Sequence, residues 1–180
     1  MGKRWEVRLI GTGGQGIVTV SIILANAAVK EGNNVVQSQN YGPEVRGGHS
    51  TSYVIASDTS ILYPKIDSPN VMLVMSNKDY EKYLPELADE GMLIMNGQAG
   101  DEAIPDRVYF VPITDIAHDI IKRPITANIV SLGVIVGMTG MVSEEEALEA
   151  MKAAVPAKAF DINKKAFALG IEAGKEALKR

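Results

Sequence analysis

The chain contains 180 residues, of which 46% are hydrophobic and 22% are charged, which is typical of a soluble globular domain with a sizeable core. A formal net charge of −4, without any Lys- or Arg-rich run, argues against a general nucleic-acid binder. Because cysteine is absent, the chain has no disulfide, thiol catalysis or cysteine-ligated cluster. Its two histidines, His49 and His118, are far apart in the sequence, which argues against a transition-metal site.

The start of the chain, MGKRWEV, lacks the apolar core of a signal peptide. The longest apolar stretch, 129–142, is interrupted by serine, threonine and glycine and is too short to span a bilayer. We therefore expect a cytoplasmic protein with no membrane partner.

The first elements in chain order form a predicted β-α-β unit. A buried strand over 5–10 leads through a glycine-rich turn into a largely buried helix over 17–31, which Gly32 and Asn33 end. A second strand is predicted over 34–39, parallel to the first and reached by a right-handed crossover. The segment 40–50 is rich in glycine and polar residues and is predicted to be a loop.

Further strands are predicted over 50–57, 70–76, 91–96 and 107–112. Asn77 is a candidate cap for a helix over 78–90, shortened or kinked by Pro85. Later helices are predicted from Pro124 to about 139, from the Ser143 capping box to Pro156, and through the C-terminal tail. This order predicts one domain over 1–180, a three-layer α/β/α fold with a mostly parallel or mixed sheet.

The stretch GTGGQG holds a G-x-G-x-x-G pattern at Gly11, Gly13 and Gly16. A glycine turn before a helix can direct backbone N–H groups at an anion, but it also simply allows close packing of helix on strand. A dinucleotide site needs an acidic residue near the end of the second strand, and 34–39 contains none. Gln37 or Gln39 could bond a ribose instead, so this alternative stays open.

Two other polar residues are candidates. Arg46 lies in the loop YGPEVRGGHS, where it either pairs with Glu44 or is offered to a carboxylate or phosphate. Asn128 lies near the start of an apolar helix and either satisfies a backbone group or faces a ligand or another subunit. No catalytic triad, carboxylate pair or metal constellation is visible. The lack of candidate catalytic groups indicates a binding subunit whose chemistry is carried out by a partner.

The segments GTGGQGIVTVSIILANAAVKEG and YGPEVRGGHSTSYVIAS together resemble the gamma subunits of 2-oxoacid:ferredoxin oxidoreductases. The resemblance extends through PNVMLVMS and TANIVSLG to INKKAFALGIEAG and covers almost the whole chain. The form YGPEVRGG, with a chain of this length, is most similar to the 2-oxoglutarate branch, while pyruvate and other 2-oxoacids define the neighbouring branches.

The resemblance implies a role in oxidative decarboxylation of a 2-oxoacid to an acyl-coenzyme A, with electrons passed to ferredoxin. Thiamine diphosphate and the iron–sulfur clusters would sit on alpha, beta and delta-type partner subunits, and coenzyme A would reach the interface. No catalytic residue is then expected here. The expected binding residues are Gly11, Gly13, Gly14, Gln15, Gly16, Arg46 and Asn128.

Two alternatives remain at this stage. One is a free-standing Rossmann-like nucleotide-binding protein, and the other is a purely structural assembly subunit in which the glycine loop is only a turn. The isolated chain is also expected to be inactive and is a candidate homodimer.

Overall fold

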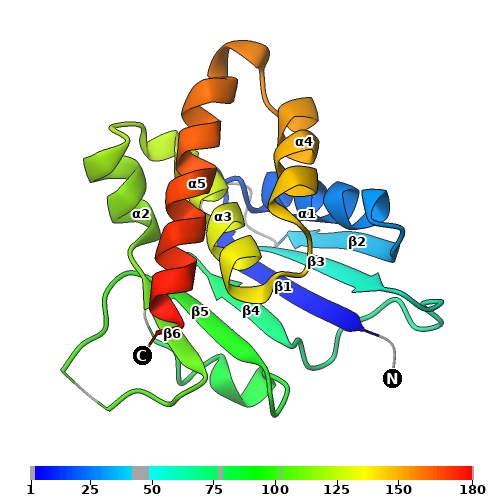
Figure 1. The fold of residues 1–180 in the computed structure, drawn as a ribbon. Helices are drawn as coiled ribbons and strands as arrows, with labels where there is room; N and C mark the ends of the chain where they lie inside the picture. Colours follow the sequence, from blue (N-terminus) through cyan, green and yellow to red (C-terminus); the bar gives the residue numbers. More distant parts are fainter. Residues whose placement is uncertain (1–2, 42–48, 77–78, 102, 180) are drawn as a thin grey trace.

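A six-stranded mixed sheet forms the centre of the computed structural model, which describes residues 3–41, 49–76, 79–101 and 103–179 (Figure 1). The strand order is β2-β3-β1-β4-β5-β6. The strands span Arg4–Thr12 (β1), Asn34–Tyr41 (β2), His49–Ser57 (β3), Val71–Val74 (β4), Met92–Asn96 (β5) and Val108–Val111 (β6). The predicted α/β class with a mixed sheet is confirmed.

The direction of the strands changes at β3. Strands β1, β4, β5 and β6 are parallel neighbours, whereas β3 pairs antiparallel with both β1 and β2. Strands β1 and β2 therefore run in the same direction, as predicted. They are not neighbours, however, because β3 lies between them.

Helices cover one face of this sheet (Figure 1). Side chains from alternate positions of β1 and β3, such as Val7, Leu9 and Val54, are fully buried beneath them. The four long helices span Ile17–Lys30 (α1), Ala127–Thr139 (α3), Glu144–Ala154 (α4) and Phe160–Ala177 (α5). A short helical segment, α2 (Ile113–Asp115), continues into a π-turn over Ile116–Ile120. No helix in the described ranges is long and apolar enough to cross a membrane.

The predicted helix starts at Pro124 and Ser143 are confirmed. Pro124 opens a 3-10 turn, Pro124–Thr126, that runs directly into α3. The Ser143 hydroxyl accepts a hydrogen bond from the Glu146 amide at 3.2 Å and caps α4. The Ser143 amide donates to the Glu31 carboxylate rather than to Glu146, while Glu146 lies 3.6 Å from the Lys30 ammonium. The end of α1 thus holds the beginning of α4.

The opposite face of the sheet is only partly covered. Tyr83 and Leu87 pack over apolar side chains of β4 and β5 there. The predicted helix over 78–90 is wrong, because the described part forms only the 3-10 turn Leu84–Glu86. Pro85 explains this, since it lacks an N–H donor and its ring clashes with the preceding turn of an α-helix. The candidate cap Asn77 lies outside the described residues.

Glycines allow α3 and α5 to approach closely. A Cβ added at Gly133 would lie 2.2 Å from the Phe167 carbonyl oxygen, and one added at Gly170 would lie 2.1 Å from the Val130 carbonyl oxygen. Both obstacles are backbone atoms, which cannot turn away as a side chain can. Gly133 and Gly137 lie four residues apart on one face of α3, and their lack of a side chain allows the backbone of α5 to approach.

Replacing Gly170 by alanine should separate α3 from α5. We expect Gly170→Ala to lower the free energy of unfolding by about 1–3 kcal/mol, as overpacking of a core does. Gly100→Ala is the matched control because nothing lies within 4 Å of a Cβ at that position. Chemical denaturation of both variants measures the difference, and equal stabilities would contradict the argument.

Candidate functional site: the glycine loop

The glycine loop joins the carboxyl end of β1 to the beginning of α1. Gly11 and Thr12 still belong to β1, Gly13 and Gly14 form an exposed turn, and Gly16 is the N-cap residue of α1. The φ angles of Gly14 and Gly16 are 92° and 71°. This left-handed region is costly for residues with a side chain, so the loop needs glycine at both positions.

Gln15 closes the loop on itself. Its side-chain oxygen accepts from the Thr12 amide at 2.8 Å, and its own amide donates to the Thr12 carbonyl at 3.1 Å. A Cβ at Gly11 would lie 2.7 Å from that side-chain oxygen. The amide of Gln15 is therefore engaged inside the loop, which leaves the amides of Gly13, Gly14 and Gly16 as the candidate donors.

Asn128 brings α3 into contact with the loop. A Cβ at Gly16 would lie only 2.5 Å from the Asn128 side-chain nitrogen. The Asn128 side-chain oxygen accepts from the Ile129 amide at 2.9 Å, which directs its amino group toward the loop. Residues more than a hundred positions apart in the sequence thus meet at one point, and both were expected in the site.

The donors of the loop have no acceptor among the described residues. No described group accepts a hydrogen bond from the amides of Gly13, Gly14 or Gly16, and no side chain caps the first turn of α1. The beginning of a helix carries a partial positive charge, so the loop presents an electropositive backbone surface. A phosphate or carboxylate is the group that such a surface attracts.

The loop also lies at a topological switch point of the sheet. After β1 the chain turns to the helical face, whereas the segment that follows β4 packs on the opposite face. A crevice opens between the carboxyl ends of two such parallel strands, where α/β proteins commonly bind ligands. The Ser76 hydroxyl, just beyond β4, is buried and has no hydrogen-bond partner among the described residues.

Ser76 and Asn96 are polar residues at this edge that sequence reasoning missed. Asn96 ends β5, and its side chain donates to the Met75 carbonyl and accepts from the amide and hydroxyl of Thr114. The missed signal was available, because both residues follow apolar runs predicted as parallel strands, whose carboxyl ends share one edge. Their bonds indicate that Asn96 positions the backbone, while Ser76 keeps a free hydroxyl at the crevice.

Comparison with known proteins places the chain in a family. The model described as pyruvate ferredoxin/flavodoxin oxidoreductase matches residues 6–173. The 2-oxoglutarate synthase subunit KorC of Methanocaldococcus jannaschii is 39% identical over 178 residues, covering 96% of this chain and 95% of that protein. The chain belongs to the gamma subunits of the 2-oxoacid:ferredoxin oxidoreductases.

Solved structures carry the same fold. The gamma subunit of a keto/oxoacid ferredoxin oxidoreductase from Geobacter sulfurreducens has a TM-score of 0.80 and 36% identity, covering 96% of this chain and 99% of that one. The 2-oxoglutarate:ferredoxin oxidoreductase of Magnetococcus marinus has a TM-score of 0.85 at 24% identity, and the match covers 97% of this chain but 31% of that one. The gamma-subunit fold therefore occurs both as a separate chain and as part of a longer one.

Arg46 is expected to add a positive charge to the site of this gamma subunit. It lies outside the described residues, as does Glu44. The other expected residues, Gly11 to Gly16 and Asn128, come together as described above. Within the described parts of the chain, no group of three or more His, Cys, Asp or Glu side chains is placed to hold a metal ion.

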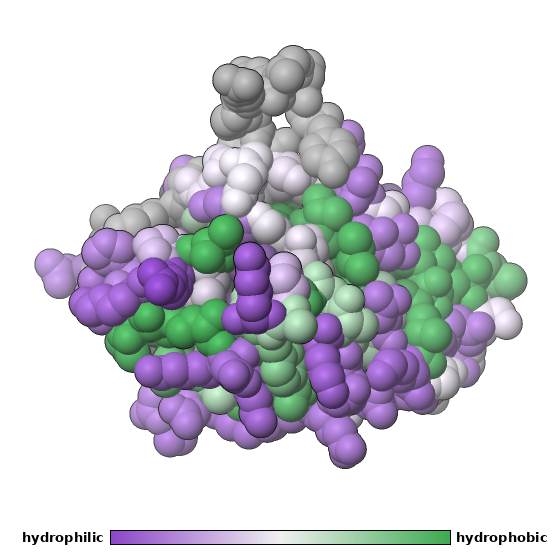
Figure 2. Space-filling model, turned by 90° about the horizontal axis from the view of Figure 1, so that it is seen from above, coloured by the Kyte–Doolittle hydropathy of each residue, from purple (hydrophilic) through white to green (hydrophobic). Residues whose placement is uncertain are grey.

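A hollow of about 700 Å³ lies beside Asn128, between the beginning of α3 and the loop before α5. Its floor is apolar, with Ile129 and Ile162, and Arg123 and Lys158 stand exposed around it. Figure 2 looks down on the helices and shows apolar patches separated by hydrophilic residues rather than one continuous apolar band. The glycine loop thus adjoins a concave surface with two basic side chains.

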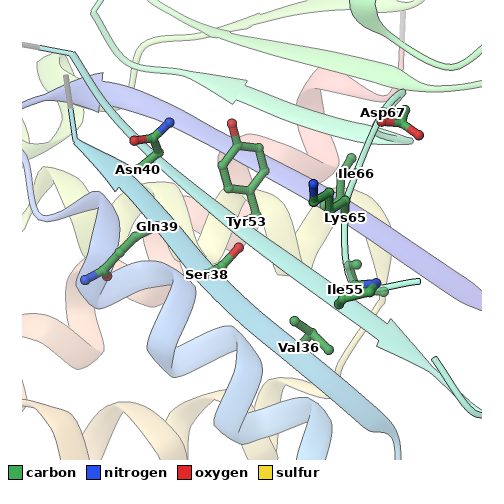
Figure 3. A pocket seen from close by; sticks show the side chains of 10 residues that line it. Val36, Ser38, Gln39, Asn40, Tyr53, Ile55, Lys65, Ile66 and Asp67 are labelled. Atoms are coloured by element: carbon green, nitrogen blue, oxygen red, sulfur yellow. The ribbon is translucent and has the colours of Figure 1, made fainter. Parts of the chain in front are cut away.

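A second hollow, of about 380 Å³, lies on the face of the sheet away from the helices (Figure 3). Tyr53 of β3 stands between Asn40 of β2 and Lys65 of the segment before β4. The alternation of β3 directs Tyr53 away from buried Val54, so this hollow does not communicate with the glycine loop through the sheet. None of the expected site residues that the structure describes lines it.

The contact between Gly16 and Asn128 can be measured by a double-mutant cycle. We expect Gly16→Ala to destabilise the chain by about 1–3 kcal/mol, because it adds a steric clash to an unfavourable φ. Adding Asn128→Ala should recover part of this loss, since the obstructing side chain is removed. Gly14→Ala is the control, with an unfavourable φ but nothing within 4 Å. Equal losses at Gly14 and Gly16 would contradict the contact.

Proposed function

We propose that this chain is the gamma subunit of a 2-oxoglutarate:ferredoxin oxidoreductase and that its glycine loop receives an anionic part of coenzyme A. The identity with the KorC subunit over nearly the whole of both chains supports the substrate. The accompanying alpha, beta and delta-type subunits would carry thiamine diphosphate and the iron–sulfur clusters, with ferredoxin as the electron acceptor. A single domain over 1–180 would then serve as a binding subunit.

The geometry of the loop supports the second part of this proposal. Three backbone amides that have no acceptor among the described residues lie where α1 begins, and the Asn128 amino group lies beside Gly16 and lines a hollow with two basic side chains. A phosphate group accepts several such hydrogen bonds at once, and charge-assisted bonds are the stronger ones. In this proposal Arg46 supplies a further positive charge from its loop.

The strand order argues against the dinucleotide alternative. In a Rossmann unit the second strand adjoins the first and carries the acid that binds the ribose. Here β3 occupies that place, and β2 is one strand further from the glycine loop. The side-chain nitrogen of Gln37, moreover, donates to the Ser21 hydroxyl of α1 at 3.0 Å, so this donor is already engaged within the chain.

The substrate can be tested with the assembled complex. We expect reduction of ferredoxin with 2-oxoglutarate at a kcat/KM at least about tenfold above that with pyruvate or 2-oxoisovalerate, equivalent to about 1.4 kcal/mol. A methyl-viologen assay measures all three under the same conditions. A higher kcat/KM with pyruvate would overturn the substrate and leave the role of the subunit unchanged.

Asn128 tests the binding of coenzyme A. In Asn128→Asp an acceptor with a negative charge replaces the amino donor beside the loop, so we expect the KM for coenzyme A to rise about tenfold, since one lost charge-assisted bond is worth about 1.5–3 kcal/mol. The KM for the 2-oxoacid should stay unchanged. Asn26→Asp, on the exposed side of α1, is the matched control.

An unchanged KM for coenzyme A in an assembled Asn128→Asp complex would favour the purely structural alternative. Arg46→Gln gives an independent reading of the same site, because it removes only a charge from the expected set. Assembly is checked by gel filtration, so that loss of the complex is not mistaken for loss of binding.

A further inference from the structure

Strand β2 is an unusually well-exposed sheet edge. It is eight residues long and pairs with β3 without a break from Asn34 to Tyr41, while no described strand lies on its other side. Proteins usually protect such an edge with charged residues, proline, a bulge or shortness. β2 has no charged residue and no proline, and its unbroken register leaves no bulge. The opposite edge, β6, is only four residues long.

Above this edge, α1 carries an apolar stripe. The stripe consists of four residues at helical spacing: Val18, Ile22, Ala25 and Val29. Val18 is half-buried and Ala25 is buried, so they form the inner side of the stripe. Ile22 in the middle of α1 and Val29 near its end are 41% and 56% exposed, which is high for large apolar side chains.

One hydrogen bond and one ion pair fix the direction of the stripe. The Gln37 side chain of β2 donates to the Ser21 hydroxyl at 3.0 Å, so Ser21 faces β2, whereas Lys30 faces α4 through Glu146. Ile22 lies about 100° round the helix from Ser21, on the flank away from α4. The stripe therefore stands over the free edge of the sheet.

Both features have the symmetry that a second copy needs. A two-fold axis perpendicular to the sheet brings β2 antiparallel to β2 of the copy and places the two α1 helices on one face. Centred on Gln37, it sets Gln37 opposite itself, Val36 opposite Ser38 and Val35 opposite Gln39, with no charged residue on the seam. Because Ser21 lies over Gln37, Ile22 falls close to the axis.

We propose that β2 pairs with β2 of a second copy of this chain, so that the sheet continues across a two-fold axis and the apolar stripes of the two α1 helices pack together. A second copy offers a suitable surface for both features at once. Its own uncharged β2 pairs with the edge strand, and its own apolar stripe packs against the stripe on α1. The inference does not depend on the proposed function, because it uses none of the residues expected to bind coenzyme A and can be tested without partner subunits.

Light scattering on the purified full chain tests the seam. We expect a dimer, and we expect Ile22→Glu to raise its dissociation constant at least about tenfold, because two carboxylates then meet near the axis. Leu178→Glu is the matched control: it changes another apolar helix residue that is likewise 41% exposed but lies at the end of α5. Its dissociation constant should not change, and circular dichroism checks that both variants fold.

Hydrogen exchange on β2 gives a second reading. The outward amides of β2 should exchange slowly in the dimer and quickly in Ile22→Glu, and Ser38→Lys should act like Ile22→Glu by charging the edge. A monomer at about 100 μM, above the Kd of a specific interface, would overturn the proposal. So would a dimer unaffected by both variants, or protection of β2 only in the presence of other subunits, which would assign the edge to a partner.

Discussion

The position of β3 is the constraint on which the other features of this subunit depend. By pairing antiparallel with both β1 and β2, it separates two strands that a Rossmann unit keeps together. The strand that precedes the glycine loop consequently has no parallel neighbour on its β3 side, and its parallel neighbour is β4 on the other side. The same insertion moves β2 to the edge of the sheet and leaves Tyr53 and Ile55 on a face that no long helix covers.

The glycine loop is held by tertiary packing rather than by its own hydrogen bonds alone. Gly16 touches Asn128 at the beginning of α3, and α3 in turn lies against α5 through Gly133 and Gly170. Because α3 and α5 meet backbone against backbone, a small shift of α5 is transmitted to α3 with little compensation from side chains, and the Asn128 side chain carries it to Gly16. The geometry of the donors therefore depends on helix packing far from the loop, which is why small residues matter on α3 and α5 although they contact no ligand.

Local patterns predicted most elements of this fold but not their arrangement. The buried strands, the Ser143 cap and the start at Pro124 follow from signals within a few residues. The insertion of β3 does not, although a signal for it existed: the connection from Tyr41 to His49 is too short for a parallel crossover of about a dozen residues, so β2 and β3 had to form an antiparallel hairpin. Pro85 was expected only to shorten or kink the helix over 78–90, but the described part of this segment forms no more than a 3-10 turn.

For the candidate site, too, the sequence predicted local features but not tertiary contacts. The glycine spacing identified the loop and its need for left-handed residues, and Asn128 was noticed as a polar residue in an apolar helix. That the two touch could not be derived, since helix packing across more than a hundred residues decides it. The hydrogen bond from the Thr12 amide to the Gln15 side-chain oxygen, which closes the turn, could not be derived either.

Exposure of the loop bears on where an anion can bind tightly. Gly13 and Gly14 are exposed in the isolated chain, and a charge at an exposed helix terminus gains only about 0.3–1 kcal/mol, further reduced by salt. The same amides act more strongly once water is excluded, because the effective dielectric constant falls. A surface that covers the loop would thus convert a weak attraction into a binding site. Under the proposed function the companion subunits supply that surface, so strong binding of coenzyme A and assembly of the complex would be one coupled event.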